Sequence, residues 1–256
     1  MRKLPALLAI AGMAAIAAPA FAQDNPAPQD TTKGFYVTAG AGGSWGSSAS
    51  TTYNNPTVSL GNTNYGTSGT LTGNTPLGGG VAVEAGFGYD FGNSIRSELT
   101  YLYNNGSLGA TSLTADVTTG GTRYTGTANP NTSGTFSTNS VMLSGYYDIQ
   151  TKTKFTPYVG AGIGYTSVSL PSQNRVTGSY TVNGSSGTGW IDYAGGSASA
   201  FGYQAKVGVS YAVSKPADVY VEGTYQGNTG TSINNLNLSA LNLFGVRAGF
   251  RYRFGS

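Results

Sequence analysis

The chain has 256 residues, of which only 9% are charged, and it contains neither cysteine nor histidine. Without these two residue types the chain has no disulfides, thiol nucleophiles or imidazole bases, and it lacks the commonest zinc ligands. We therefore expect no enzyme, no metal site and no cofactor. When Arg2 and Lys3 are left out, 11 of the 13 basic residues remain against 10 acidic residues, so the net charge is close to zero. We therefore also expect no binding to nucleic acid.

Residues 1–22 have the layout of a signal peptide. Arg2 and Lys3 precede an apolar run that extends from Leu4 to Ala18, and the run is followed by the small-residue cleavage site at residues 20–22. The run is shorter than the roughly 18 to 20 apolar residues of a membrane-spanning helix, and no later segment reaches that length. We predict an exported protein with a disordered leader over residues 23–33.

From residue 34 onward, eight segments alternate apolar and polar residues, which is the pattern of a β-strand with two different faces. The clearest segment runs from Val81 to Phe91, and the Gly92-Asn93-Ser94 turn connects it to the next segment, which predicts a hairpin. The first apolar residues of the eight segments are Phe35, Val81, Ile95, Val141, Val159, Phe201, Val219 and Phe244.

The connections between these segments alternate between short and long. The turns near Gly92, Thr151 and Lys215 are short, whereas residues 46–78, 105–134 and 169–199 form long Gly-, Ser- and Thr-rich stretches, and 227–240 is intermediate. In an antiparallel arrangement all long connections leave from one end. With aromatic residues at the strand ends, this layout is typical of an outer-membrane barrel.

We therefore predict an all-β fold, a closed eight-stranded antiparallel transmembrane β-barrel over residues 34–254. It should have short periplasmic turns and long, structureless extracellular loops. A secreted β-sandwich or a soluble eight-stranded barrel is the alternative.

Several segments resemble a known family. The alternating stretch Phe244–Phe254 resembles the assembly signal of outer-membrane barrels, and Thr156–Tyr165 and Phe201–Tyr211 resemble the OmpA-like small porin superfamily, particularly its opacity-protein and surface-antigen branches. The resemblance implies the bacterial outer membrane, with outer-membrane lipid, lipopolysaccharide and the barrel assembly machinery as partners. Members of the family usually end on the aromatic residue itself, whereas Gly255 and Ser256 follow here. The residues of the expected assembly signal are Phe250, Tyr252 and Phe254.

On each predicted strand the polar residues occupy every second position, and this alternation places six charged residues on the face that lines the inside of the barrel. They are Glu84, Arg96, Glu98, Lys206, Glu222 and Arg247. Buried charges need partners, so we expect Lys206 to pair with Glu222, Glu222 with Arg247, and Asp90 with Arg96. The other lumen positions are rich in glycine, which suits a narrow interior. The set favours a structural plug, with a selectivity ring or an acid–base pair of Glu84 and Glu98 as alternatives.

The long connections carry aromatic residues among small polar ones: Tyr53, Tyr65, Tyr124, Tyr180, Trp190 and Tyr193. Aromatic side chains with Ser, Gly and Asn neighbours are typical of loop-based binding surfaces, although they can also be solvated tips resting on the barrel rim. We therefore expect a surface protein with a structural, adhesion or antigen role and with host or environmental ligands at the loops. A narrow passive channel for ions or small polar solutes is the alternative.

Overall fold

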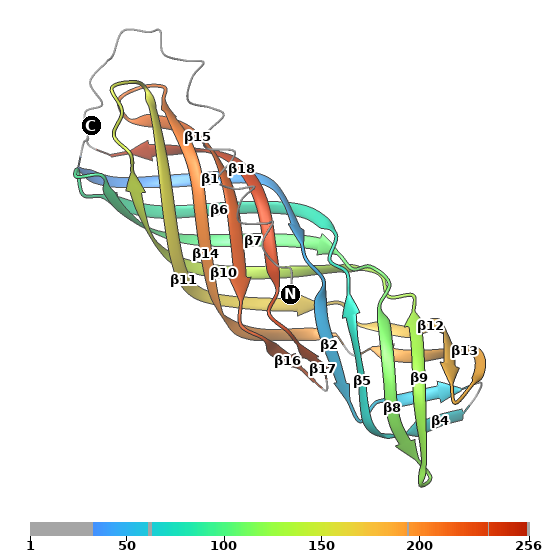
Figure 1. The fold of residues 1–256 in the computed structure, drawn as a ribbon. Coiled ribbons are helices and arrows are strands. Elements are labelled where there is room, and N and C mark those ends of the chain that lie inside the picture. Colours follow the sequence, from blue (N-terminus) through green and yellow to red (C-terminus); the bar gives the residue numbers. More distant parts are fainter. Residues whose placement is uncertain (1–32, 61–62, 194, 235, 255–256) are drawn as a thin grey trace.

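The computed structural model describes residues 33–60, 63–193, 195–234 and 236–254, so the predicted signal peptide and nearly all of the predicted leader lie outside the described residues. Eight long strands close into an antiparallel barrel in the order β1-β18-β15-β14-β11-β10-β7-β6, which confirms the predicted fold (Figure 1). The strands are β1 (Gly34–Gly46), β6 (Gly79–Asp90), β7 (Ile95–Ser107), β10 (Thr135–Asp148), β11 (Phe155–Leu170), β14 (Gly196–Ala212), β15 (Ala217–Asn228) and β18 (Asn242–Arg253).

The alternation of each barrel strand separates an outer apolar face from a buried lumen face. On β7, Leu99 is 52% exposed whereas its neighbours Glu98 and Thr100 are 3% and 1% exposed. A continuous exposed apolar belt of this kind is unfavourable in water, but it matches the hydrocarbon of a bilayer. In the described part of the chain no helix is long and apolar enough to cross a membrane.

Aromatic rings gather near both ends of the outer face. At the end with the short turns, the ring of Phe35 lies 5.2 Å from that of Phe87 and 4.8 Å from that of Tyr89, measured between centroids. At the other end, the rings of Tyr225 and Phe244 lie 5.3 Å apart. These two groups correspond to the aromatic girdles that such barrels place at the membrane surfaces.

The prediction that the long connections are structureless was wrong. They form ten further strands, which Figure 1 shows gathered beyond one end of the barrel; we call this part the extension. Its strands are β2 (Ala49–Asn54), β3 (Thr57–Leu60), β4 (Thr63–Gly66), β5 (Ser68–Thr75), β8 (Ser112–Thr119), β9 (Thr122–Pro130), β12 (Gln173–Val182), β13 (Ser185–Tyr193), β16 (Thr231–Ile233) and β17 (Leu236–Leu238).

Local turn chemistry explains why these connections fold back as hairpins. Gly120 and Gly121 both have positive φ between β8 and β9, and Asn183 and Gly184 have positive φ between β12 and β13. Two consecutive residues with positive φ form the two-residue turn that best matches strand twist. Pairing of the hairpins with one another then satisfies backbone groups that would otherwise form exposed edges.

The extension continues the wall of the barrel. Its sheet order is β16-β17-β2-β5-β8-β9-β12-β13-β3-β4, so most of its strands follow the order of the barrel strands from which they arise. The order changes at β13, which pairs with β3 through Trp190 and Ser59 rather than with β16. The sheet of the extension is therefore open on that side.

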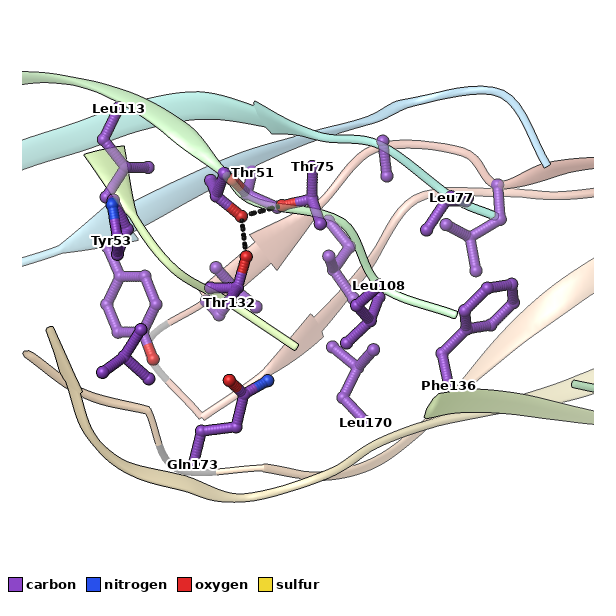
Figure 2. Close-up of a pocket in the computed structure, with 17 residues that line it drawn as sticks. Thr51, Tyr53, Thr75, Leu77, Leu108, Leu113, Thr132, Phe136, Leu170 and Gln173 are labelled. Atoms are coloured by element: carbon purple, nitrogen blue, oxygen red, sulfur yellow. Dashed lines mark hydrogen bonds between the residues drawn. The ribbon is translucent and has the colours of Figure 1, made fainter. Parts of the chain in front are cut away.

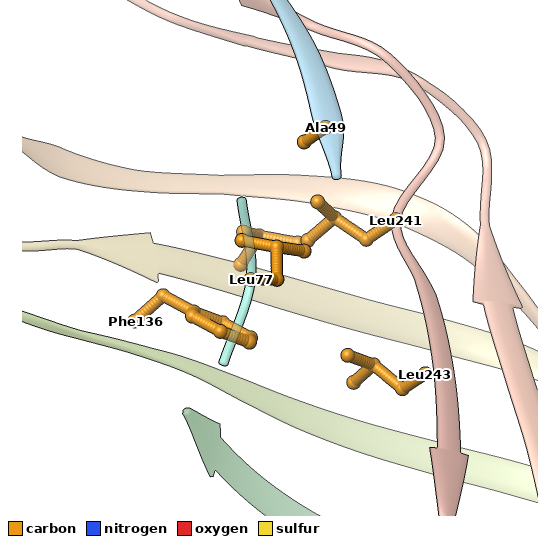
Figure 3. Close-up of a cluster of buried hydrophobic side chains, with 6 residues drawn as sticks. Ala49, Leu77, Phe136, Leu241 and Leu243 are labelled. Carbon is orange, nitrogen blue, oxygen red and sulfur yellow. The ribbon is translucent and has the colours of Figure 1, made fainter. Parts of the chain in front are cut away.

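A buried hydrophobic cluster lies where the barrel meets the extension, and we call it the lumen cap (Figure 3). Phe136 comes from β10 and Leu243 from β18, strands that lie on opposite sides of the barrel. The cluster therefore spans the interior. Its buried members are Ala49, Leu77, Phe136, Val168, Leu241 and Leu243.

Candidate functional site in the lumen and the extension

Four of the six predicted lumen charges meet at the centre of the barrel. Lys206 Nζ lies 2.8 Å from Glu84 Oε2 and 3.0 Å from Glu222 Oε1, and Arg247 Nη1 lies 2.9 Å from Glu84 Oε2. All four side chains are buried. Because β14 and β6 lie on opposite sides of the barrel, the contact between Lys206 and Glu84 crosses the lumen.

The remaining two predicted charges lie closer to the short turns. Arg96 Nε donates to both carboxylate oxygens of Asp148 at 3.1 Å, and Arg96 Nη1 lies 3.6 Å from Glu98 Oε2. Closer still to the short turns, Nη1 of Arg251 and Nη1 of Arg253 lie 3.4 and 2.7 Å from Oδ2 of Asp218. The structure therefore places all six predicted residues in one buried lumen, in two neighbouring groups.

Two of the three predicted pairings need correction. The predicted pair of Lys206 and Glu222 is present, but Arg247 bonds to Glu84 although Glu222 stands opposite it in register. Asp90 likewise stands opposite Arg96 in register, yet its ion pair is with Arg253, at 3.8 Å.

The physical reason is the length of the side chains. Both corrected pairs join β18 to β6, the two strands that flank β1, so the arginine side chains reach past a whole strand to partners that the register of adjacent strands does not reveal.

Four buried tyrosines complete the charged layer, and the sequence analysis missed them. Their hydroxyl groups donate to lumen carboxylates: Tyr36 and Tyr146 to Glu98, both at 3.1 Å, Tyr158 to Glu222 at 2.9 Å, and Tyr220 to Glu84 at 2.9 Å. The carboxylates therefore have both cationic and hydroxyl partners. Because the carboxylate oxygens of Glu84 and Glu98 already have these partners, the structure disfavours the use of the two residues as an acid–base pair.

Each of these tyrosines stands opposite a glycine of the next strand. The pairs are Tyr36 with Gly88, Tyr146 with Gly160, Tyr158 with Gly208 and Tyr220 with Gly249. A Cβ added to any of these glycines would lie 2.2 to 2.6 Å from the opposite ring. The glycines therefore leave the space that the rings occupy, so they do not indicate a lumen with little room for side chains, as the sequence alone suggested.

A layer of amides lies between the charges and the lumen cap. Asn104 Nδ2 donates to Gln226 Oε1 at 2.8 Å across the lumen, and Gln226 Nε2 donates to Ser140 Oγ at 2.7 Å. Arg247 Nη2 donates to Asn104 Oδ1 at 3.2 Å and links this layer to the charges. Charged, amide and apolar layers thus follow one another from the short turns to the extension.

The extension contains a cavity of about 60 Å³ directly above the lumen cap (Figure 2). Leu77 and Phe136 of the cap form part of its lining, and Leu108 and Leu170 lie beside them. Tyr53 also lines it, and burial raises the pKa of this phenol to about 12. A second cavity, of about 230 Å³, lies further out along the same sheet.

The predicted recognition aromatics line these cavities. Tyr53 lines the first cavity, whereas Tyr124, Tyr180 and Trp190 line the second. The predicted positions 65 and 193 have side chains outside the described residues. The four described aromatics are therefore half-buried on an inner surface rather than presented on loop tips.

The outer surface of the extension carries an exposed ion pair. Arg123 donates through Nε and Nη2 to the two carboxylate oxygens of Asp116, at 2.8 and 2.7 Å, at the hairpin of β8 and β9. These hydrogen bonds hold the pKa of Asp116 below its usual range. No cluster of three potential metal-ligating side chains from His, Cys, Asp and Glu occurs within the described ranges.

Known proteins give the following likenesses. Neisserial surface protein A is 20% identical over 86% of this chain and 97% of its own, with a TM-score of 0.43. OprG from Pseudomonas aeruginosa is 14% identical over 89% and 99%, with a TM-score of 0.40. Ail, the attachment invasion locus protein of Yersinia pestis, solved with the heparin analogue sucrose octasulfate, is 9% identical over 86% and 99%, with a TM-score of 0.36.

No curated protein matches the chain. The family described as "Surface antigen", however, matches residues 81–249, which is more than half of the chain and covers five barrel strands entirely and most of β6 and β18. The chain therefore belongs to the surface antigen family, as an eight-stranded barrel of the bacterial outer membrane.

Proposed function

We propose that the protein is a surface recognition protein in which the barrel is an anchor and the extension carries the binding function. The observation that carries this proposal is the division of the molecule into a filled lumen and an extension with cavities. Side chains bridge the lumen at three levels, through Lys206 and Glu84, through Asn104 and Gln226, and through the lumen cap. The extension is the part that reaches beyond the membrane.

The internal pairing of the lumen charges supports a plug rather than a conduit. A permeating ion is stabilised by groups that are free to exchange partners, whereas Glu84 and Glu222 are each bound to Lys206 and to a tyrosine hydroxyl. Removal of one partner from such a buried pair is strongly unfavourable. Movement of the side chains out of the ion path therefore carries a large free-energy cost.

A narrow channel is the second candidate, and one observation favours it. Three buried nitrogen atoms, Arg96 Nη2, Arg247 Nε and Arg251 Nε, have no hydrogen-bond partner among the described residues. Buried polar groups of this kind usually bind ordered water. A chain of such waters would be the route of a passive channel for small ions.

Conductance in planar bilayers separates the two candidates. The mature protein is refolded in detergent, its folding is verified by a heat-sensitive gel shift, and single-molecule currents are recorded for the wild type and for Glu222→Gln. Silence of the folded wild type supports the anchor. Steady current steps whose ion preference changes in Glu222→Gln would establish the channel and reject the anchor.

The partners follow from the two surfaces of the molecule. We propose that the exposed apolar belt contacts outer-membrane lipid and the lipid portion of lipopolysaccharide, and that the extension meets host or environmental ligands. The end of the barrel formed by β18 and the residue that follows it, with Phe250, Tyr252 and Phe254 exposed, is the proposed contact for the barrel assembly machinery. Antibodies raised against the whole refolded protein should label intact cells if the extension is on the cell surface.

A further inference from the structure

The two cavities of the extension adjoin each other, because Leu113, Pro130 and Val176 line both, and we call the pair of cavities the chamber. Along β8 the first cavity meets Leu113, and the second meets Leu113, Ala115, Val117 and Thr119. At about 3.3 Å per residue, the second cavity alone follows this strand for roughly 20 Å. The chamber is therefore elongated along the strand and suits a linear occupant better than a compact one.

Three threonine hydroxyl groups and one carboxamide group in the lining of the first cavity are already bonded to protein. Thr111 Oγ1 lies 2.8 Å from both Thr75 Oγ1 and Thr132 Oγ1 (Figure 2). Thr132 Oγ1 also donates to the carbonyl oxygen of Gly109 at 2.6 Å. The carboxamide oxygen of Gln173 accepts from the backbone N–H of Ser133 at 3.1 Å. These groups therefore leave mainly their hydrocarbon portions for an occupant.

The lining of the chamber contains no Asp, Glu, Lys or Arg among the described residues. The charges of the lumen lie on the other side of the lumen cap, which forms part of the chamber floor through Leu77 and Phe136. A charged ligand would lose its hydration in the chamber and find no counter-ion there, which is strongly unfavourable. An uncharged apolar ligand meets surfaces of its own kind.

We propose that this chamber binds an uncharged molecule with a linear alkyl chain. The inference rests on the proposed function, because it places the binding activity in the extension. The sheet does not close between its edge strands β4 and β16, and entry of such a molecule between these two edges would break no strand pairing. The bound chain would run along β8, with Leu113 near its middle and Trp190 beside its outer part.

The two tryptophans of the chain provide a direct assay. Trp190 lines the chamber, whereas Trp45 is exposed on the membrane face of β1. Trp45→Phe therefore gives a protein whose tryptophan fluorescence reports on the chamber alone. In phosphatidylcholine vesicles, we expect a brominated linear alkane to quench Trp190 saturably, and unbrominated alkane to reverse the quenching.

Two variants on one strand test whether the chamber is the site. Ala115 faces the chamber and Thr114 faces away from it. In the Trp45→Phe background, Ala115→Phe should fill the chamber and weaken the apparent affinity by about tenfold or more, which corresponds to 1.4 kcal/mol or more. Thr114→Phe, the matched control, should bind like its parent.

Leu113→Phe serves as the second filling variant, so that a folding defect of one variant leaves the test intact. The heat-sensitive gel shift identifies the variants that are folded.

The remaining arms identify the source and the charge of the ligand. Bromine on the acyl chains of the vesicle lipid, in place of the alkane, tests whether a lipid tail enters the chamber. Quenching by either probe supports the alkyl-chain site when it is weaker in Ala115→Phe than in Thr114→Phe. Non-saturable quenching that is equal in Ala115→Phe and Thr114→Phe overturns the proposal, as does binding confined to an ionised fatty acid. The conductance assay is independent, so a silent barrel without alkane binding would reject this inference and leave the anchor standing.

Discussion

Tyr36 of β1 and Gly88 of β6 stand directly opposite each other, and the tyrosine ring occupies the space where a side chain of residue 88 would lie. A Cβ at residue 88 would be 2.2 Å from Cζ of Tyr36 and 2.6 Å from the carbonyl oxygen of Ser97. Because the second contact is with backbone, a shift of the ring alone cannot relieve it. The hydroxyl of Tyr36 is also held, since it donates to Glu98.

Gly88→Ala should therefore destabilise the barrel. Overfilling a packed interior typically costs about 1–3 kcal/mol, and the loss should appear as a lower urea midpoint for unfolding in detergent. Gly145→Ala is the matched control, because a Cβ at that position on β10 meets nothing within 4 Å. Equal midpoints for the two variants would show that the ring of Tyr36 does not require the glycine.

Glu84→Gln should weaken the centre of the lumen. Its carboxylate holds both Lys206 and Arg247, so the substitution leaves two buried cations with Glu222 as their nearby carboxylate. Breaking a buried ion pair usually costs about 3–5 kcal/mol, and urea unfolding monitored by the gel shift measures the loss. Asp116→Asn breaks an exposed pair in the extension and should leave the barrel midpoint unchanged. A stable Glu84→Gln barrel would mean that the cluster does not hold the lumen together.

The barrel strands could be predicted because each residue of a membrane barrel faces one of two very different environments. Val83 faces lipid and Glu84 the lumen, and this contrast is visible in a single strand of sequence. The position of Lys206 could be predicted in the same way. Its contact with Glu84 could not, because it depends on the diameter of the closed barrel and on side chains of a distant strand.

The extension was missed for a different reason. Gly, Ser and Thr make up half of the residues in its strands, a composition that resembles that of loops, although Asn183-Gly184 is a recognisable hairpin signal. These strands are held by pairing with neighbours that are far away in sequence, such as Tyr180 with Ala128. The tyrosine–glycine pairs were missed because the alternation within one strand shows which face a residue occupies but not which residue of the next strand lies opposite it. It therefore does not reveal which glycine lies opposite Tyr36.

The C-terminal strand provides a prediction about assembly. Phe254 is 49% exposed on the outer face, and its ring lies 5.6 Å from that of Tyr252. If this C-terminal segment is the assembly signal, Phe254→Ser should reduce the amount of heat-modifiable protein in the outer membrane of expressing cells, with unfolded protein accumulating in the periplasm. The purified variant should still refold in detergent. Tyr211→Ser, an outer-face aromatic on β14, is the control, and equal losses in both variants would indicate a general need for aromatics at the membrane surface.

Alkaline pH should loosen the extension through Tyr53. Burial raises the pKa of this phenol to about 12, whereas an unfolded tyrosine titrates near its ordinary value of about 10. The folded extension thus favours the neutral phenol. The resulting contribution to stability is complete below about pH 10, declines between 10 and 12, and is lost above the folded pKa.

In the Trp45→Phe background, the fluorescence of Trp190 reports this loosening as pH rises. Tyr53→Phe cannot ionise at this position, so its extension should keep its Trp190 signal to a higher pH than the parent. Tyr124→Phe removes a hydroxyl from the outer cavity and controls for quenching by other tyrosinates. If the parent and Tyr53→Phe lose the signal over the same pH range, the ionisation of Tyr53 is not what opens the extension.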